Sequence, residues 1–434
     1  MKLTAEKLAQ RLASELGADA VSLDADLLSS HRVDSKQPAL VCTPDRESAS
    51  AALRLCAEAD AAITPWGGGS AMALGNPPRQ VDVVLDTSRL DRVIDHDPAN
   101  LTVTVESGIT LTGLQSSLSA QRQFVPVDPP FPERSTVGGI VAGNLNGPRR
   151  SYYGSVRDLV IGMKVSLISG ERIKAGGKVV KNVAGYDMCK LFVGSLGTLG
   201  IITELTLRLT PVPEAEVTLA ASGSLLELSE FAGEILDSVL LPSAIVLWTT
   251  ETSSSSETPQ LGWQMAVRAE GFAEHVGRHL RDLKLLAERL GLATVSYANA
   301  AHEKLWAGIS DFPILGHELV YRLMVPRSAT GDLLHGLQDL GSTHSSPAIV
   351  ADMAAGAIWI GSNETRSATA QFSQLQSKAA QHNGHVALVD APAEVKRDLD
   401  IWGPTPAAFF LMRKIKQQFD PHRLMNPGRF VGRL

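Results

Sequence analysis

Cysteine is scarce in this chain of 434 residues, which contains only Cys42, Cys56 and Cys189. No two of them have the Cys-x-x-Cys spacing of zinc ribbons and thioredoxin-like redox motifs. A disulfide framework is therefore not indicated, and we expect three buried, reduced thiols. Because a 4Fe–4S cluster takes four thiolate ligands, this chain cannot supply such a cluster by itself.

Long apolar runs and basic stretches are also lacking. No segment reaches the roughly 20 apolar residues that cross a bilayer, and the formal charge of −6 argues against a nucleic-acid surface, which needs a basic stripe. Residues 1–20 place apolar side chains at helical spacing among charges, which predicts an amphipathic helix of the mature protein. We expect a cytoplasmic protein, for which contact with the inner membrane would come through partners.

Two common nucleotide-binding motifs are missing. No glycine run ends in Gly-Lys-Ser or Gly-Lys-Thr, as a Walker A loop requires. The glycines of Gly194–Gly200 are spaced by three, and the β-branched residues that follow predict a strand where a Rossmann fingerprint needs a helix.

Three glycine-rich segments are present instead. In the first, the apolar Ile63-Thr64-Pro65-Trp66 leads into Gly67-Gly68-Gly69-Ser70. Glycine accepts positive φ, so successive amides of such a turn can point inward and hold a phosphate or diphosphate; a plain tight turn is the alternative. The second segment is 136–144, preceded by the stiff 127–130, and the third is 194–203, reached through 181–187.

The remaining pattern separates two regions. The first 210 residues predict strands at 40–42, 62–64, 81–85, 101–105 and 203–209 and a helix at 46–60. Pro211-Val212-Pro213 marks a boundary, because prolines end both strands and helices. Beyond it, strands (244–248, 319–323) alternate with helices (274–290, 367–382), which predicts an α+β domain with an antiparallel sheet. The polar segment 252–258 is expected to be a loop between two of its strands.

The order of the three glycine segments resembles the FAD-binding domain of the vanillyl-alcohol oxidase family, also called the PCMH type. Within that family, the segments 145–150, 178–187 and 426–430 resemble the FAD-binding E subunits of glycolate oxidases. The resemblance implies an α+β chain: a PCMH-type FAD-binding domain of two α/β subdomains, plus an α+β cap domain with an antiparallel sheet. The implied divisions are a helical segment (1–37), the FAD-binding domain (38–212), the cap (213–415) and a segment returning to the FAD-binding domain (416–434).

The resemblance also implies which residues contact the cofactor. The set comprises Pro65, Trp66, Gly67, Gly68, Gly69, Ser70, Pro129, Thr136, Val137, Gly138, Gly139, Ala142, Asn144, Gly194, Gly197, Thr198, Gly200, Ile202 and Asn426. The amides of 67–70 are expected at the diphosphate, Ala142 and Asn144 on the isoalloxazine side, and 197–202 at the adenosine end. Ser70 stands where some relatives carry a histidine bonded to the flavin, so we expect noncovalent FAD. For the Asn426-Pro427-Gly428 segment, a simple docking turn is the alternative.

The substrate site is not identified by the sequence. His275 and His279 are four residues apart on an expected helix and could share one face, although a solvated helix surface is favoured. His382 and His385 have a spacing that metal ligands can have, but they flank an Asn-Gly turn, and metal binding is not favoured. His302 and His317 are candidates for a general base. A general base must first lie within hydrogen-bond distance of the proton that it removes, and only then does its pKa matter.

Two adjacent arginines offer a second candidate feature. Arg149 and Arg150 could hold a substrate carboxylate. We favour slightly the alternative that they neutralise the diphosphate or lie in solvent.

Two functions remain. In the first, the chain takes hydride from a small 2-hydroxy acid such as glycolate onto FAD and passes electrons to a partner. In the second, it is a noncatalytic FAD-carrying subunit that relays electrons or supports a catalytic paralogue. In both, the resemblance implies a complex with an FAD-bearing paralogue and an iron–sulfur subunit. A flavin reductase of cell-wall synthesis shares the fold but fits residues 181–187 poorly.

Overall fold

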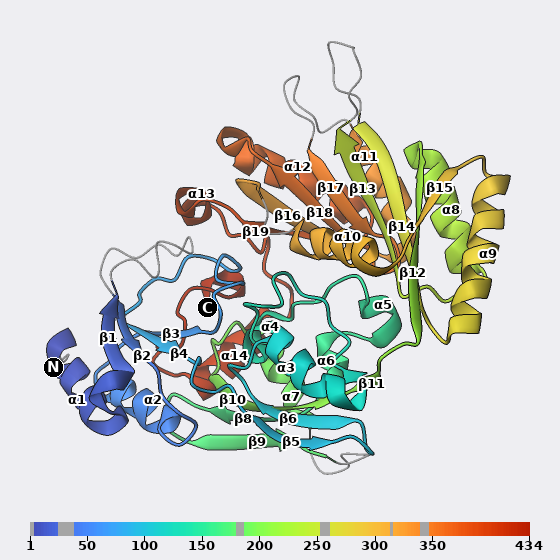
Figure 1. Ribbon diagram of the computed structural model, residues 1–434. Coiled ribbons are helices and arrows are strands. Elements are labelled where there is room, and N and C mark those ends of the chain that lie inside the picture. Colours follow the sequence, from blue (N-terminus) through green and yellow to red (C-terminus); the bar gives the residue numbers. More distant parts are fainter. Residues whose placement is uncertain (1–3, 25–38, 179–185, 252–260, 313–315, 339–346) are drawn as a thin grey trace. The chain divides into compact units, whose positions relative to one another are not determined.

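The computed structural model describes residues 4–24, 39–178, 186–251, 261–312, 316–338 and 347–434. The chain forms two compact units, whose elements are labelled in Figure 1. Unit 1 comprises residues 1–146, 155–211 and 392–434, and unit 2 comprises residues 147–154 and 212–391. Two expectations fall outside the described residues: the segment 181–185 and the polar loop at 252–258.

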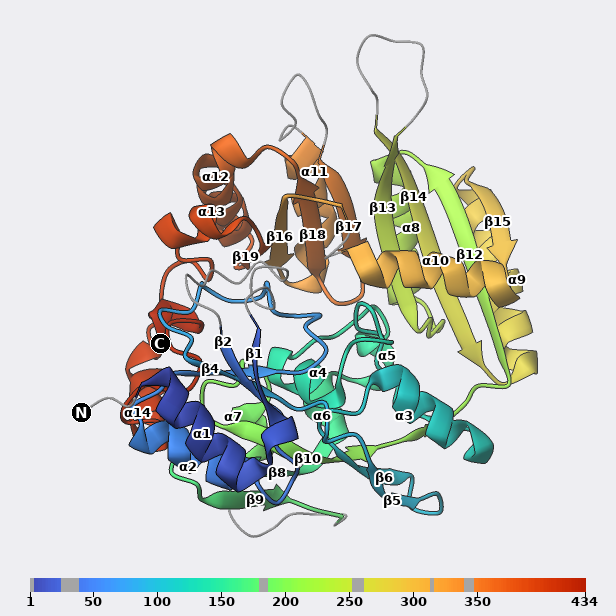
Figure 2. The same cartoon turned by 60° about the vertical axis from the view of Figure 1, so that its left-hand side comes forward.

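The first sheet of unit 1 has the strand order β1-β2-β4-β3. Its strands are β1 (Val21–Asp24), β2 (Ala39–Cys42), β3 (Ile63–Trp66) and β4 (Val83–Asp86). The strands β2, β4 and β3 run parallel, as the predicted strand–helix–strand pattern requires. Helices α1 (Ala5–Leu16) and α2 (Ala49–Glu58) bury leucine, alanine and cysteine side chains against this sheet (Figure 2).

The second sheet of unit 1 is antiparallel, in the order β5-β6-β10-β8-β9. Its strands are β5 (Val93–Asp97), β6 (Thr102–Glu106), β8 (Val160–Ser166), β9 (Arg172–Gly176) and β10 (Ile201–Arg208). Its apolar core is shared with α3 (Leu111–Leu118), α4 (Val137–Gly143), α6 (Val156–Leu159) and α7 (Cys189–Phe192). A short ladder joins β7 (Gln123–Phe124) to β11 (Thr210–Pro211), where unit 1 ends.

Unit 2 is built on one antiparallel sheet of eight strands, in the order β15-β12-β14-β13-β17-β18-β16-β19. The strands are β12 (Ala215–Gly223), β13 (Ala244–Glu251), β14 (Leu261–Gly271), β15 (Ala293–Tyr297), β16 (Leu319–Met324), β17 (Ala348–Asp352), β18 (Ala357–Ser362) and β19 (His385–Asp390). The helices are α5 (Arg150–Tyr153), α8 (Leu225–Asp237), α9 (Ala273–Arg289), α10 (Asn299–Asp311), α11 (Thr330–Leu337) and α12 (Ala368–Gln381). Helix α10 packs Trp306 and Ile309 against Ala244, Val246 and Ala266 of the sheet, and α8 and α9 cover the opposite face (Figure 1).

The predicted fold class is confirmed: two α/β subdomains and a cap with an antiparallel sheet. The chain passes between the units at positions that differ from the expected divisions. Residues 147–154 lie in unit 2, because Arg149 forms ion pairs with Glu216 and Glu270 of its strands. The chain returns to unit 1 at residue 392, whereas the expected division was at residue 416. The return is earlier because the buried Lys396 on α13 (Ala393–Asp398) donates to the carbonyl of Ala73.

The C-terminal part of unit 1 is fixed by a buried ion pair. On α14 (Phe409–Phe419), Lys416 Nζ donates to Asp420 Oδ2 at 2.6 Å and to the carbonyls of Thr198 and Met425 at 2.7 and 2.8 Å. The carboxylate of Asp420 also accepts from the amides of Leu424 and Met425. Both charges are therefore buried with their hydrogen-bonding capacity used. None of the described helices is long and apolar enough to cross a membrane.

Replacing Lys416 by methionine should destabilise unit 1 by about 3–5 kcal/mol, because Asp420 would remain as a buried carboxylate without a cation. Urea denaturation followed by circular dichroism measures the change. The control is Lys414→Met on the same helix: Lys414 is exposed, and the cost should stay near 0.5 kcal/mol. Equal effects of the two substitutions would contradict the role assigned to the buried pair.

Candidate cofactor site

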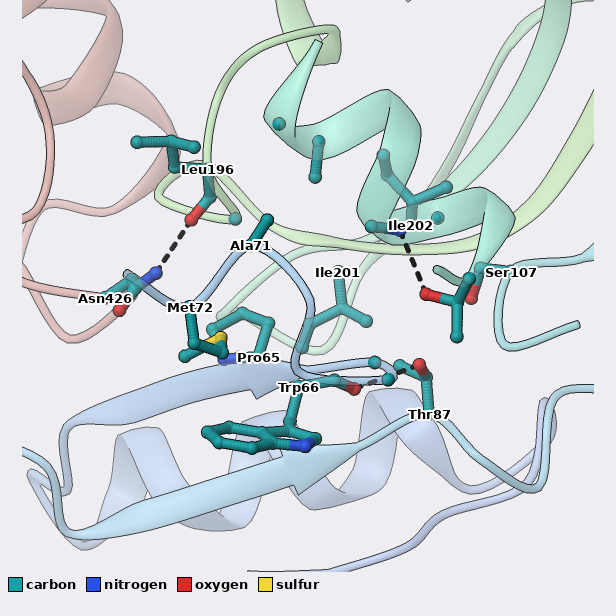
Figure 3. A pocket seen from close by; sticks show the side chains of 18 of the residues that line it. Pro65, Trp66, Ala71, Met72, Thr87, Ser107, Leu196, Ile201, Ile202 and Asn426 are labelled. Carbon is teal, nitrogen blue, oxygen red and sulfur yellow. Dashed lines mark hydrogen bonds between the residues drawn. The ribbon is translucent and has the colours of Figure 1, made fainter. Parts of the chain in front are cut away.

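The three glycine segments meet at one pocket of unit 1, together with the C-terminal segment (Figure 3). The pocket encloses about 760 Å³ of space, including open solvent. The residues expected from the sequence that line it are Pro65, Trp66, Gly67, Gly68, Gly69, Ser70, Thr136, Gly138, Gly139, Ala142, Gly197, Gly200, Ile202 and Asn426.

The first loop follows β3 and lies directly against the backbone before α4. A Cβ added at Gly68 would come 1.6 Å from the carbonyl oxygen of Arg134, and one at Gly67 would come 2.3 Å from Thr136 Oγ1. Gly69 has a φ of 75°, in the left-handed region that favours glycine. The first two glycines are therefore required by the close approach of the second loop, and the third by backbone conformation.

The second loop enters α4 through a cap. Thr136 Oγ1 accepts a hydrogen bond from the Gly139 amide, and the Gly138 amide donates to the carbonyl of Ser107 at 2.7 Å. A Cβ at Gly138 would lie 2.7 Å from Ser107 Cβ. The two glycines thus let the start of α4 pack against the turn after β6, with Thr136 satisfying one of the free helix amides.

The third loop packs against the first. Gly197 has a φ of 67°, and a Cβ there would come 2.7 Å from Pro65 Cγ. The carbonyl of Leu196 accepts a 2.7 Å hydrogen bond from Asn426 Nδ2 (Figure 3). The third loop is therefore held between the first loop and the C-terminal segment.

Five residues expected at the cofactor do not line the pocket: Pro129, Val137, Asn144, Gly194 and Thr198. Val137 is buried in the apolar core. Asn144 ends α4 in the left-handed conformation, with a φ of 48°. The Gly194 amide donates to Val141, and the Thr198 hydroxyl donates to the carbonyl of Ser195. Asn144, Gly194 and Thr198 therefore shape the backbone of the second and third loops.

Several lining residues were not expected from the sequence. They are Ala71, Met72, Thr87, Ser107, Gly143, Leu196 and Arg429. Gly143 and Leu196 lie within the second and third glycine segments, whereas Thr87 and Ser107 come from turns without a recognisable motif, so the sequence offers no signal for these two. Arg429 is different, because a charged side chain directly after an Asn-Pro-Gly turn is a visible feature.

The Arg429 guanidinium clamps the loop that follows Ser70. Its Nη2 donates to the carbonyls of Met72 and Leu74 at 2.8 and 2.5 Å. Arg429 is buried, forms no ion pair with any of the described carboxylates, and burial lowers its pKa to about 10. The C-terminal segment thus contributes a buried positive charge to the pocket wall.

The histidines proposed as a general base lie in unit 2. His302 is buried, with Nδ1 2.9 Å from Thr218 Oγ1 and Nε2 3.1 Å from Glu216 Oε2. Both ring nitrogens are therefore hydrogen-bonded within unit 2. His317 is half-buried, and burial lowers its pKa.

The remaining histidine candidates show no ligand arrangement. His275 is exposed on α9 and His279 is half-buried on the same helix. His382 and His385 flank a turn before β19. Among the described residues, no group of three or more histidine, cysteine, aspartate or glutamate side chains could hold a metal ion.

The solvent position considered for Arg149 from the sequence is wrong. Its side chain forms ion pairs in unit 2, where Nη2 is 3.7 Å from both Glu216 Oε2 and Glu270 Oε2. Arg268 binds the same two carboxylates, with Nε 2.9 Å from Glu270 Oε2. Burial raises the pKa of Glu270, while the charge of Arg149 opposes that rise.

Part of the chain matches a known domain family. Residues 38–176 match the family model of an FAD binding domain. Two solved structures share the fold, each with a TM-score of 0.75. An alkyldihydroxyacetonephosphate synthase is 17% identical, with 99% of this chain and 87% of that chain covered. A substrate-bound p-cresol methylhydroxylase is 18% identical, with 98% of this chain and 96% of that chain covered.

The chain has the FAD-binding fold of the vanillyl-alcohol oxidase family. Its sequence is 29% identical over 373 residues to the glycolate oxidase subunit GlcE of Escherichia coli (strain K12), covering 85% of this chain and 92% of the relative. It is 26% identical over 428 residues to the glycolate oxidase subunit GlcD of Bacillus subtilis (strain 168), covering 92% and 90%. A D-lactate dehydrogenase of Anaerostipes hadrus is 36% identical over 180 residues, 42% of this chain and 38% of the relative.

The residues of the pocket fit FAD. The hydroxyl of Ser107 lines the pocket, is buried and has no hydrogen-bond partner among the described residues, so it is available to a polar group of a ligand. The buried Arg429 and the amides of the glycine loop provide positive potential for a diphosphate. Ser70 Oγ forms a 2.8 Å hydrogen bond with Ser135 Oγ.

To test whether the first loop binds a diphosphate, a negative charge must be introduced at a position that already carries a side chain. Aspartate at Gly68 would fail on steric grounds, because its Cβ would collide with the Arg134 carbonyl. Ala71 lines the pocket and is half-buried. Ala71→Asp and Ala71→Asn have nearly the same shape and differ in one negative charge.

We expect Ala71→Asp to bind FAD at least tenfold more weakly than Ala71→Asn. Two negative charges 8 Å apart repel by about 2 kcal/mol at an effective dielectric of 20, and 1.4 kcal/mol corresponds to a factor of ten. Fluorescence titration of the apoprotein with FAD measures both affinities. Equal affinities would place the diphosphate away from this loop.

Proposed function

We propose that this chain is an FAD-linked oxidoreductase subunit that takes hydride from a small 2-hydroxy acid and passes the electrons to a partner protein. The observation that carries the proposal is the convergence of three glycine loops and the C-terminal segment on one pocket. The substrate class is supported by the glycolate oxidase subunits and the D-lactate dehydrogenase to which the sequence is similar.

In this proposal the chain's own residues bind and orient the cofactor. The amides of Gly67–Ser70, with the buried charge of Arg429, hold the diphosphate. Ser107 donates a hydrogen bond from the turn after β6, and Asn426 fixes the third loop against the pocket. FAD supplies the hydride acceptor, since the redox chemistry belongs to the cofactor and its orientation belongs to the protein.

The FAD is proposed to be noncovalent. A serine hydroxyl at position 70 cannot replace the histidine that bonds the flavin in some relatives, and Ser70 is engaged by Ser135. Acid precipitation of the purified protein should therefore release the flavin into the supernatant, as its absorbance will show. Flavin that stays with the pellet would overturn the noncovalent assignment.

A noncatalytic role is the second candidate. His302 has both ring nitrogens hydrogen-bonded to side chains of unit 2, and the similarity to GlcE extends over most of both chains. In this role the FAD relays electrons, or the chain supports a catalytic paralogue.

Either role requires an electron acceptor. The cysteines are buried, and burial raises the pKa of Cys42 to about 12 and of Cys189 to about 11, so these thiols are poor metal ligands at neutral pH. The partners we propose are an FAD-bearing paralogue and an iron–sulfur subunit, as in a glycolate oxidase complex. The proposed location is the cytoplasm.

Anaerobic mixing with glycolate or D-lactate separates the two roles. If the isolated, FAD-loaded chain is catalytic, its flavin absorbance should bleach. Admission of oxygen should then restore the absorbance slowly, because the proposed acceptor is a protein. A flavin that stays oxidised with both acids favours the relay role, whereas rapid peroxide formation would contradict the need for a partner.

A further inference from the structure

The two ends of the sheet in unit 2 differ in how far they are covered. At one end, β19 is mostly buried, its pairing with β16 contains a register shift, and Pro392 follows it after one residue. At the other end, β15 pairs with β12 alone among the described strands, over five residues without a bulge (Figure 1). On β15, Ala293 and Ser296 are exposed and Val295 is 57% exposed. Within the part of the chain that the structure describes, the outer side of β15 is therefore a free sheet edge.

The sequence of β15 lacks the features that keep sheet edges apart. Exposed edge strands usually carry a charge, a proline or a bulge, because their unpaired amides and carbonyls otherwise pair with a further strand. Strand β15 is Ala293-Thr294-Val295-Ser296-Tyr297, which contains neither a charged residue nor proline. The partner that fits such a row of backbone donors and acceptors is another extended strand.

We propose that β15 pairs antiparallel with β15 of a second copy of this chain, which joins the two eight-stranded sheets into one. The strand is complementary to itself about its central residue. In that register Val295 faces its own counterpart, Thr294 faces Ser296, and Ala293 faces Tyr297. Pairs of β-branched residues and pairs of hydroxyl residues stabilise antiparallel strands, and this register brings no like charges together.

The charges beside the edge are complementary under the same symmetry. Helix α9 packs on β12 and β15 and ends three residues before β15 begins. Arg289 of α9 binds Glu234 of α8, whereas Lys284 and Glu288 are exposed on another side of α9 and form no ion pair among the described residues. Antiparallel pairing of β15 about a two-fold axis places the two α9 helices antiparallel on one face of the joined sheet. Lys284 of each copy then lies beside Glu288 of the other.

The size of the contact predicts a reversible dimer. A ladder of five residues is about 17 Å long at roughly 3.4 Å per residue. Such a contact is smaller than a standard interface, which buries about 800 Å² on each partner, so the dimer should form only as the protein concentration rises. The inference concerns unit 2 alone and does not depend on the FAD chemistry proposed above.

Sedimentation velocity of the FAD-loaded full chain, from submicromolar concentrations upward, tests the dimer. The wild type should convert from monomer to dimer. Val295→Lys and Val295→Glu should each raise the dissociation constant of the dimer at least tenfold, because position 295 faces itself and like charges directly opposite repel. Both replace an exposed side chain, so circular dichroism of the monomer should match the wild type. Val239→Lys, at an 84% exposed valine after α8, should dimerise like the wild type.

Two further measurements identify the occupant of the edge. An equimolar mixture of the Val295→Lys and Val295→Glu proteins should dimerise again, because opposite charges then face each other across the pairing. In the wild type, hydrogen exchange of the amides of residues 293–297 should slow as the dimer forms, a result that needs no variant.

Four outcomes would overturn the proposal. They are a wild type that stays monomeric throughout, a dimer that both charged variants leave unchanged, a mixture of the two that does not associate, and exchange at 293–297 that is independent of concentration. A wild type that is monomeric alone and protects residues 293–297 only with a different protein would assign the edge to that protein and exclude self-pairing. Failure of the chain to bind FAD or to oxidise a 2-hydroxy acid would contradict the proposed function and leave the dimer standing.

Discussion

The pocket of unit 1 depends on the close approach of backbone segments at positions without a side chain. Gly67 and Gly68 lie against residues 134–136, Gly138 against Ser107, and Gly197 against Pro65. Each contact is so close that an added Cβ would collide with the neighbouring residue. Because the carbonyl of Arg134 cannot move aside as a flexible side chain could, the loops are locked in their mutual positions. Preorganised amides of this kind can bind an anion without the entropic cost of ordering the loop at the time of binding.

The C-terminal segment then closes this arrangement with buried polar contacts. Lys416 reaches Thr198, Asn426 reaches Leu196, and Arg429 reaches Met72, so that each contact joins the end of the chain to one of the loops. The buried cations are held in two ways: Lys416 by a carboxylate and carbonyls, and Arg429 by carbonyls alone, with its Nε left without a hydrogen-bond partner among the described residues. A buried charge adds little net stability but strongly disfavours alternative packings, which here is a hypothesis for why this segment returns to unit 1.

The sequence predicts the parts of the site that depend on local backbone chemistry. Glycine runs and the Thr136 cap carry local signals, so the three loops could be found, as could the two sheets and the cap. Ser107 and Thr87 could not, because a serine or threonine in an ordinary turn gains its role only when another loop packs against it. Arg149 was misjudged for the same reason: its partners Glu216 and Glu270 lie on distant strands, and the sequence does not show which arginine of a neighbouring pair receives them.

Charge compensation in the cap also shows why such details escape sequence analysis. Arg149 and Arg150 are chemically identical and adjacent, yet Arg149 is the one that forms ion pairs with Glu216 and Glu270. The difference arises from strand register, which places Glu216 opposite Glu270 on β12 and β14. Two carboxylates brought side by side would repel each other, and burial already raises the pKa of Glu270. The charges of Arg149 and Arg268 oppose this repulsion, because both arginines form ion pairs with the two glutamates.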